Sequence, residues 1–278
     1  MLKVKLAIGA ALGSAFVLGA LAVGFSAAQP QDGAKDAMSH APKEKVTTSF
    51  SDLQEEEIGE LVRAYLMENP EVIIEAVNKY SIEQRMAEAE MGKAAATELL
   101  PQLLDASTSY VGGKSPDKAK VAVIELYDYH CGYCKRAAGL VKDLVKNDAD
   151  VKVVLRELPI LREESGYAAE MALAARDQGK FLDFHFDMLS ASGVLTKERV
   201  DEMARKHGLD VAKMNAVIDT GAIPNMIENN HRLAQEMLVD GTPAFIIASL
   251  DGSYVEMVNG FNEDAVKARI KEAKAAAR

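Results

Sequence analysis

The chain has 278 residues, 49% of them hydrophobic and 27% charged, and this length allows one large globular domain or two small ones. Its formal net charge of −10 at pH 7 argues against nucleic acid as a partner, because phosphate binding needs a basic surface. The chain has only two cysteines, close together in the sequence, which excludes a fold held by several structural disulfides.

Residues 1–28 have the pattern of a targeting segment. Two lysines near the start precede an uncharged apolar run over residues 6–25, and the small residues up to Ala28 predict a cleavage site. The apolar run is also close to the length that spans a bilayer. We therefore expect either cleavage after Ala28 or retention of residues 6–25 as an anchor in the inner membrane. Both outcomes place the rest of the chain outside the cytoplasm, in the periplasm.

A linker and a helical segment come next. Residues 29–49 are rich in Pro, Gly, Lys, Asp and Thr, which predicts a flexible linker. Residues 50–105 predict two helices separated at Pro70. Their apolar stripes, which two helices cannot bury alone, must pack on the following domain or on copies of the same segment, as in a homo-oligomer. The stripes contain Leu53, Ile58, Leu61, Val62, Tyr65 and Leu66 in the first helix and Ile73, Ile74, Val77 and Tyr80 in the second.

The two cysteines lie in the most informative stretch of the chain. A polar connector at residues 105–118 precedes an apolar run at 121–126, which predicts a buried strand. Cys131-Gly132-Tyr133-Cys134 follows, and beyond it the apolar spacing becomes helical. A cysteine in the first turn of a helix meets free backbone N–H groups and the positive end of the helix dipole, which favour the thiolate. We therefore expect a pKa for Cys131 well below that of a free cysteine.

Two cysteines at this spacing can be a redox dithiol, half of a zinc site or a chance pair. A four-ligand zinc site usually needs a second pair of ligands at close spacing. The sequence offers no such pair: His130 is adjacent, but His185, His207 and His231 stand alone. We expect His185 and His207 at helix surfaces or helix ends. The strand before the cysteines and the helix after them are typical of a redox dithiol.

The remaining elements predict the fold class. Residues 151–155 form a second buried strand, parallel to the first. Residues 163–237 are helical throughout, residues 245–258 form a β-hairpin, and residues 263–274 form a terminal helix. This order predicts an α/β protein whose mixed sheet carries a helical insertion.

The region 118–278 resembles the thioredoxin fold, and its helical insertion resembles the DsbA-like branch. The resemblance rests on Cys-x-x-Cys after a strand and on Thr242-Pro243 before a hairpin. It implies that Pro243 is cis and lies against the cysteines, where Thr242 and Pro243 would position a substrate peptide. Glu125 matches a buried acid of DsbA-like proteins that could relay a proton to or from Cys134; the alternative is an ordinary carboxylate at a strand end.

The details of the motif imply a function. Cys-Gly-Tyr-Cys with Thr before the proline resembles DsbC-type disulfide isomerases, and the N-terminal helices resemble the oligomeric ScsC-type proteins. The resemblance implies thiol–disulfide exchange on cysteine-containing exported proteins, with a membrane or thioredoxin-like redox partner and no cofactor or metal. Cys131 would be the exposed attacking sulfur and Cys134 the less exposed resolving one. Gly132 and Tyr133 would set the redox potential, and His130 would either stabilise the thiolate or cover the end of the sheet.

Two other classes of function use the same residues differently. The dithiol could hold a soft ion such as Cu(I), which would make the protein a periplasmic copper handler. The chain could also be an envelope scaffold assembled through residues 50–100, with a vestigial dithiol.

Overall fold

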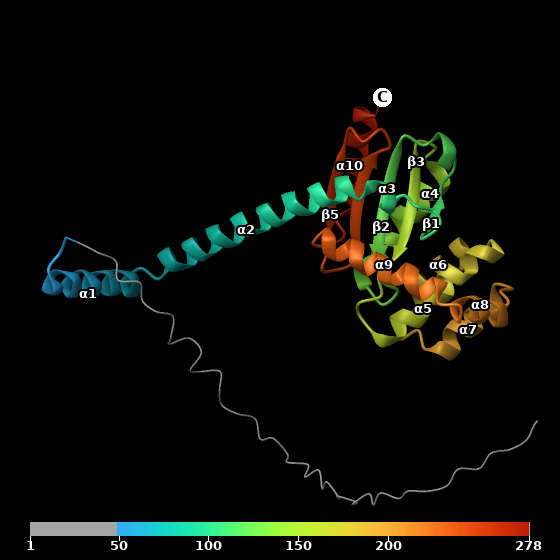
Figure 1. Ribbon diagram of the computed structural model, residues 1–278, viewed down its shortest axis with the longest axis horizontal. Helices are drawn as coiled ribbons and strands as arrows, with labels where there is room; N and C mark the ends of the chain where they lie inside the picture. Colours follow the sequence, from blue (N-terminus) through green and yellow to red (C-terminus); the bar gives the residue numbers. More distant parts are fainter. Residues whose placement is uncertain (1–48, 278) are drawn as a thin grey trace, which may run out of the picture. The chain divides into compact units, whose positions relative to one another are not determined.

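The computed structural model describes residues 49–277 (Figure 1). The predicted targeting segment and all but the last residue of the predicted linker lie outside the described residues. The chain divides into two compact units between Tyr65 and Leu66. Within residues 49–277, no helix combines the length and the apolar character needed to cross a membrane.

Helix α1 (Asp52–Glu68) provides most of the described part of the first unit. Its start is fixed by a reciprocal pair of hydrogen bonds. The Ser51 backbone N–H donates to Gln54 Oε1 at 3.0 Å, and the Gln54 N–H donates back to Ser51 Oγ at 3.4 Å. This capping box makes Ser51 the N-cap of α1. The helix buries none of its residues, so its apolar stripe faces solvent.

The second unit contains a five-stranded sheet with helices on both faces. Its strands run in the order β1-β3-β2-β4-β5, in which only β2 and β3 are parallel. The elements are α2 (Glu71–Glu98), α3 (Leu100–Leu103), β1 (Tyr110–Gly112), β2 (Val121–Tyr127), α4 (Gly132–Asn147), β3 (Val151–Glu157), α5 (Glu163–Ala174), α6 (Phe181–Ser190), α7 (Lys197–Lys206), α8 (Val211–Ile218), α9 (Ala222–Glu236), β4 (Ala244–Ser249), β5 (Val255–Asn259) and α10 (Glu263–Ala276). The predicted α/β fold with a helical insertion is confirmed.

Alternate residues of the central strands supply two hydrophobic cores, one on each face of the sheet. Val121 and Val123 of β2 join the core that contains α4, α10 and the helical insertion. Ala122 and Ile124 point the other way, into the core that contains α3, α9 and the end of α2. The side chains of a strand alternate between faces, and burial on both faces explains why β2 reads as a continuous apolar run. In Figure 1 the insertion α5–α8 gathers at the end of the sheet where β2 and β3 finish.

Strand β1 corrects the predicted polar connector. Tyr110, Val111 and Gly112 pair antiparallel with Leu155, Val154 and Val153 of β3 and form an edge of the sheet. The Tyr110 ring stacks on Phe181 with 4.4 Å between the ring centroids. A three-residue strand that ends at a Gly-Gly pair has no period long enough to distinguish it from a turn.

The end of α2 packs against the sheet of the second unit, although the sequence indicated a separate helical segment up to residue 105. Ala96, Leu99, Leu100 and Leu103 are buried in the second core. Gly92 faces the Met237 carbonyl so closely that an added Cβ would lie 2.6 Å from that oxygen. A hydrogen bond of 2.6 Å joins Lys93 Nζ to Glu256 Oε1 of β5. The helix is therefore fixed to the edge of the sheet by backbone contact, packing and an ion pair.

Replacing Gly92 with alanine tests this close approach. An alanine normally stabilises a helix interior by roughly 0.5–1 kcal/mol relative to glycine. At residue 92 the new methyl group would meet a backbone carbonyl, and we expect Gly92→Ala to lower the unfolding free energy by about 1–3 kcal/mol. Gly139→Ala is the matched control, because that exposed position in α4 has no neighbouring heavy atom within 4 Å. Urea unfolding of both variants measures the difference, and equal or greater stability of Gly92→Ala would contradict the packing described here.

Candidate active site

Cys131 occupies the N-cap position of α4. Its backbone is extended, with φ −75° and ψ 118°, and its N–H donates to the Asp128 carbonyl at 3.1 Å. The Cys134 backbone N–H donates to Cys131 Sγ at 3.4 Å, as a helix does to a capping side chain. The sulfur therefore lies where the free N–H groups and the positive end of the helix dipole stabilise an anion.

The loop before β4 covers the dithiol. The Thr242–Pro243 peptide bond is cis, as the resemblance implies. Cys131 Sγ lies 3.0 Å from the Thr242 carbonyl oxygen, which can accept a hydrogen bond from the protonated form of the thiol. Cys131 is 4% exposed and Cys134 is fully buried. The predicted exposure of Cys131 is therefore too large, because the Thr242 loop lies over its sulfur. Cys131 is still the more accessible of the two cysteines.

Opposite environments separate the acidities of the two thiols. The Cys134 thiol donates to the Cys131 sulfur and, with the N–H groups of Cys134 and Tyr133, lowers the Cys131 pKa to about 5 against the effect of burial. Burial raises the pKa of Cys134 far above its ordinary value, and the neighbouring Cys131 and Glu125 raise it further. At neutral pH Cys131 is a thiolate and Cys134 a thiol, so only Cys131 is ready to attack.

Glu125 is a buried acid in the middle of β2. It is 1% exposed, and its register partners are Leu155 of β3 and Phe245 of β4. Its Oε1 atom has no hydrogen-bond partner among the described residues. Burial first, and then the Cys131 charge, raise the pKa of Glu125 to about 8. The structure therefore places a proton-holding carboxyl next to the dithiol, and the alternative of an ordinary strand-end carboxylate does not fit its burial.

His130 joins three segments of the chain. Its Nδ1 lies 2.8 Å from Ser165 Oγ of α5, and its Nε2 accepts from the Leu195 backbone N–H at 2.9 Å. The second bond requires an unprotonated Nε2, so the ring is neutral and carries its proton on Nδ1. Burial lowers the pKa of His130, consistent with that state. Both ring nitrogens are occupied away from Cys131, which favours the second predicted role, that of covering the end of the sheet.

Asp128 is a residue of this site that the sequence interpretation missed. Its buried carboxylate accepts hydrogen bonds from the His130 N–H at 2.7 Å and the Ser165 hydroxyl at 2.8 Å. It also accepts from the N–H groups of Ile160 and Leu161, each at 2.9 Å. Asp128 thus ties the cysteine turn to the loop after β3. An aspartate just beyond the end of a strand was the available signal, because such residues commonly bind nearby backbone N–H groups.

The dipeptide between the cysteines is on the surface. Gly132 and Tyr133 are both exposed. The Arg136 guanidinium lies 3.8 Å from the centre of the Tyr133 ring. This cation–π contact positions the ring beside Cys131 without burying it.

A second buried polar cluster lies between the sheet and the insertion. Tyr127 and Tyr129 both donate to Glu157 Oε1, and Tyr129 Oη is 3.0 Å from His185 Nδ1. His185 is fully buried, and burial lowers its pKa to about 3. The prediction of a surface position for His185 is wrong. The residue lies on the apolar face of α6, four positions after Phe181, and that spacing was visible in the sequence.

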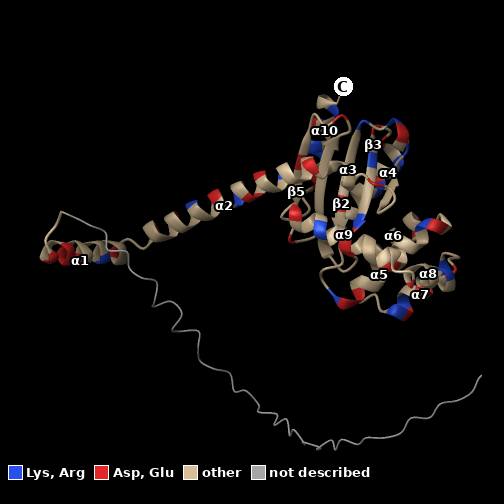
Figure 2. Cartoon of the chain, viewed as in Figure 1, with Lys and Arg blue, Asp and Glu red and all other residues tan. Residues whose placement is uncertain are grey.

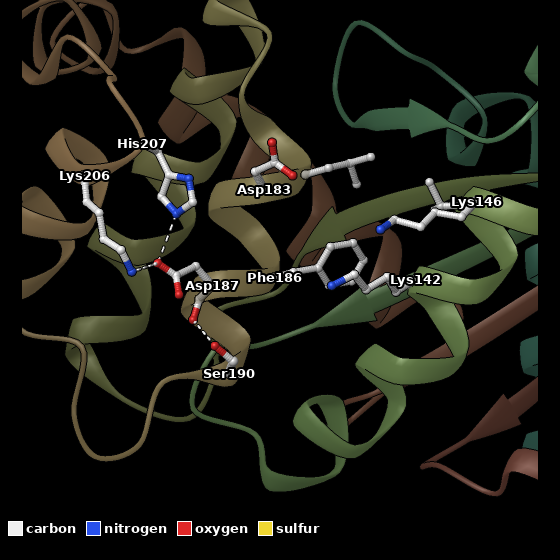
Figure 3. A pocket seen from close by; sticks show the side chains of 10 residues that line it. Lys142, Lys146, Asp183, Phe186, Asp187, Ser190, Lys206 and His207 are labelled. Carbon is white, nitrogen blue, oxygen red and sulfur yellow. Dashed lines mark hydrogen bonds and ion pairs between the residues drawn. The ribbon is translucent and has the colours of Figure 1, made fainter.

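A hollow on the domain lies away from the cysteines. Figure 3 shows a cavity of about 500 Å³ lined by the second half of α4, by α6 and by the end of α7. Its polar side chains pair with one another: His207 Nε2 and Lys206 Nζ lie 3.0 and 3.4 Å from Asp187 Oδ2. A smaller hollow of about 230 Å³ lies beside the dithiol and is lined by Tyr133, Asp240, Gly241, Thr242, Asn259 and Gly260. The smaller hollow is therefore lined by two residues close to Cys131, Tyr133 and Thr242.

The described residues offer no group of three or more His, Cys, Asp or Glu side chains arranged to hold a metal ion. Both cysteines carry free thiols. The arrangement is that of a reduced dithiol: a low-pKa sulfur at the start of α4, a buried thiol one helical turn later, and a buried acid near both.

Two family models match the chain. The model of the DSBA-like thioredoxin domain matches residues 122–271, which is more than half of the chain. The model of the N-terminal domain of copper resistance protein ScsC matches residues 54–89. The two matches cover the dithiol domain and the exposed helices separately.

Solved structures and curated sequences give the same picture. A thioredoxin-like oxidoreductase from Silicibacter pomeroyi DSS-3 is 36% identical, with 61% of this chain and 94% of that chain covered and a TM-score of 0.55. BcfH from Salmonella enterica Typhimurium is 29% identical, with 80% and 96% covered and a TM-score of 0.67. The Na(+)/H(+) antiporter NhaA of Herminiimonas arsenicoxydans is 32% identical over 147 residues, 51% of this chain and 23% of the antiporter. The chain spans about a quarter of the length of such curated relatives.

The contribution of Cys134 to the acidity of Cys131 can be measured directly. We expect the Cys131 pKa to be about 5 in the parent protein. Cys134→Ala should raise it, because the strongest hydrogen bond to the thiolate is lost while the backbone N–H groups remain. Cys134→Ser is the matched control, since its hydroxyl can still donate and should give a smaller rise. The ultraviolet absorbance of the thiolate, followed across pH, reports the midpoint. An unchanged midpoint in Cys134→Ala would show that the thiol does not stabilise Cys131.

Proposed function

The chain belongs to the DsbA-like thioredoxin family, and from this premise we propose that it catalyses thiol–disulfide exchange on exported proteins, in the manner of a disulfide isomerase. The observation that carries the proposal is the position of Cys131, a low-pKa sulfur that caps α4 one turn before a buried thiol. We place the activity in the periplasm, in line with the predicted targeting segment at residues 1–28.

The reaction begins at the Cys131 thiolate. Cys131 Sγ attacks one sulfur of a substrate disulfide, a new S–S bond forms, and the other substrate sulfur leaves as a thiolate. Cys134 then loses its proton and attacks Cys131 Sγ. This second step forms the Cys131–Cys134 disulfide, releases the remaining substrate thiolate and passes two electrons to the substrate. If the freed substrate thiolate instead attacks elsewhere on the same chain, Cys131 is regenerated and the disulfides are rearranged without net electron transfer.

Glu125 supplies the proton acceptor for the second step. Cys134 is buried and its pKa is strongly raised, so it needs a nearby base to become a nucleophile. The Glu125 pKa of about 8 belongs to the state in which Cys131 is charged. In the mixed disulfide Cys131 carries no charge, so the Glu125 pKa falls and the carboxylate is available to accept the proton. The same residue can return the proton when the disulfide is reduced.

The surrounding residues have supporting roles in this proposal. Thr242 and Pro243 hold the loop that covers the dithiol and present it to a substrate backbone. Gly132 and Tyr133 set the redox potential through the first turn of α4. The substrates are cysteine-containing exported proteins, and a membrane or thioredoxin-like redox partner returns the dithiol to its working state.

Copper handling is less well supported by the geometry. Binding of Cu(I) by two sulfurs requires both thiols to lose their protons, and the buried Cys134 opposes this. The family model named after copper resistance matches residues 54–89, a region without cysteine. Competition for copper between the reduced protein and a strong chelator separates the two functions, because an exchanger should lose the metal.

The proton relay gives the sharpest test of the mechanism. We expect Glu125→Gln to slow the resolution of a preformed mixed disulfide with glutathione by about 10²-fold at neutral pH, because removal of a general base typically costs that much or more. The parent rate should rise with pH until Glu125 is ionised and then level off, whereas the variant rate should keep rising. Stopped-flow single-turnover kinetics measure both profiles.

Glu157→Gln is the matched control for the relay, since Glu157 is an equally buried carboxyl on the neighbouring strand β3. Its resolution rate should follow the parent profile. Superimposable profiles for Glu125→Gln and the parent would exclude Glu125 as the acceptor.

We propose further that the exposed helices assemble the protein into a homo-oligomer. The apolar residues of α1 face solvent, and so do those in the first half of α2. Burial of apolar surface contributes about 25 cal/mol for each Å², which favours association of such stripes. Exposed apolar residues of α1 and α2 are Leu53, Ile58, Leu61, Val62, Tyr65, Met67, Val72, Ile73, Ile74, Val77, Tyr80, Ile82, Met86 and Met91. An oligomer would surround a misfolded substrate with several dithiols.

Charged substitutions in the full chain test the assembly. We expect the parent to be larger than a monomer in light scattering at micromolar concentration. Val77→Glu with Tyr80→Glu should reduce the measured mass, because the stripe of α2 would carry two charges. Lys79→Glu, which changes the net charge by the same two units at an exposed position off this stripe, is the control. A monomeric parent, or equal loss of mass in the double variant and the control, would contradict the proposal. Truncation is unsuitable, since residues 96–103 contribute to the core.

A further inference from the structure

The small hollow beside the dithiol continues into a second one. The second hollow has a volume of about 340 Å³ and lies between α2, β5 and the loop after α9. Asp240 and Asn259 line both hollows. The two adjoining hollows, which we call the groove, are lined by residues from Tyr133, beside Cys131, to residues 85–93 of α2. All of these residues belong to the second unit.

The helical wall of this groove is fixed in place. Gly92 of α2 approaches the Met237 carbonyl closely, and the 2.6 Å bond from Lys93 to Glu256 holds the next residue against β5. β5 is an edge strand, so the outer side of its backbone faces no other strand of the described chain. Its last residue, Asn259, lies where the two hollows meet. An edge strand bounded by a fixed helix suits an extended polypeptide segment.

Leu238 lines the groove in an unusual conformation. It is the only residue other than glycine with positive φ, at 56°, within the described range 49–277. Left-handed backbone is unfavourable for a residue with a Cβ, and glycine is the usual choice at such a helix end. The Leu238 side chain is 46% exposed, so core packing does not explain it. Because Leu238 lines the groove, its exposed side chain can contact a segment that binds there.

The charges of the groove are unequal. Figure 2 shows acidic and basic residues interspersed along α2. Lys93 is already paired with Glu256. Of the remaining charged side chains that line the second hollow, Glu88, Glu90 and Asp240 are acidic and Arg85 alone is basic. The far end of the groove therefore complements positive charge.

We propose that this groove binds the extended segment of a substrate polypeptide that flanks the cysteine engaged by Cys131, with a preference for lysine or arginine where the segment meets α2. The inference rests on the proposed exchange activity and deepens it. In this account the same helix has two surfaces: an apolar stripe in its first half, and a polar wall at residues 85–93 that selects substrate sequence.

Synthetic peptides test the preference in the full-length protein. Each peptide carries one cysteine, as a mixed disulfide with glutathione, and either a lysine or a glutamate at successive distances on either side. The rate constant for reaction with the reduced protein is compared within each lysine–glutamate pair. We expect lysine to react several-fold faster over one short range of distances on one side. Equal rates at every distance would overturn the groove, whereas failure to react with oxidised glutathione itself would overturn the exchange activity.

Two charge variants test whether the groove wall causes the preference for lysine. Glu88→Lys should abolish or reverse the lysine preference, because it changes the charge of the groove wall. Glu75→Lys, at an exposed position of α2 outside the groove, is the matched control and should keep the preference. Equal loss in both variants would assign the preference to the overall charge of the protein and overturn the proposal.

Leu238→Gly tests the apolar contact in the groove. The variant should have a higher melting temperature, and it should discriminate less between peptides with apolar and polar residues at the same distances. Unchanged discrimination would show that Leu238 does not contact the bound segment.

Discussion

The first turn of α4 directs the backbone N–H and the thiol of Cys134 at the sulfur of Cys131, and the chemistry of the domain depends on this arrangement. The arrangement needs a strand that stops just before the cysteines and a helix that starts at them. Asp128 and His130 fix the intervening turn by binding the loop after β3, Ser165 and the Leu195 backbone. The fold therefore supplies a preorganised anion site, and the cysteine supplies the anion.

Three neighbouring acidic groups, the thiols of Cys131 and Cys134 and the carboxyl of Glu125, differ in protonation state. Cys131 is ionised because donors surround it, whereas Cys134 and Glu125 keep their protons because they are buried beside its charge. When Cys131 enters a mixed disulfide, it loses its charge. The loss of this charge lowers the pKa of Glu125 and favours the carboxylate. Formation of the first bond thus prepares the base for the second step. In the proposed mechanism this coupling would give a role to the buried carboxyl in the middle of β2, whose Oε1 atom has no hydrogen-bond partner among the described residues.

Strong local patterns made the central elements predictable from the sequence. The runs at 121–126 and 151–155 have the length and composition of buried strands, and Cys131 and Cys134 lie at the strand-to-helix change that activates a thiol. Strand β1 was missed because three residues have no period. The contact between Gly92 and Met237 depends on segments far apart in the chain, so no local pattern reveals it. The burial of His185 and the bonds of Asp128 had only short local signals: the spacing of His185 from Phe181, and the place of Asp128 just past the end of a strand. Tertiary packing also drew the end of α2 into the second unit.

The central claim is that Cys131 is the sulfur that forms the bond to substrate. Incubating Cys134→Ser with a peptide disulfide should trap a covalent adduct, and proteolysis with mass spectrometry should place the peptide on Cys131. The complementary variant Cys131→Ser should form no adduct at neutral pH, because burial keeps Cys134 protonated. A peptide attached to Cys134 in that variant, at a rate comparable to that at Cys131, would contradict the account.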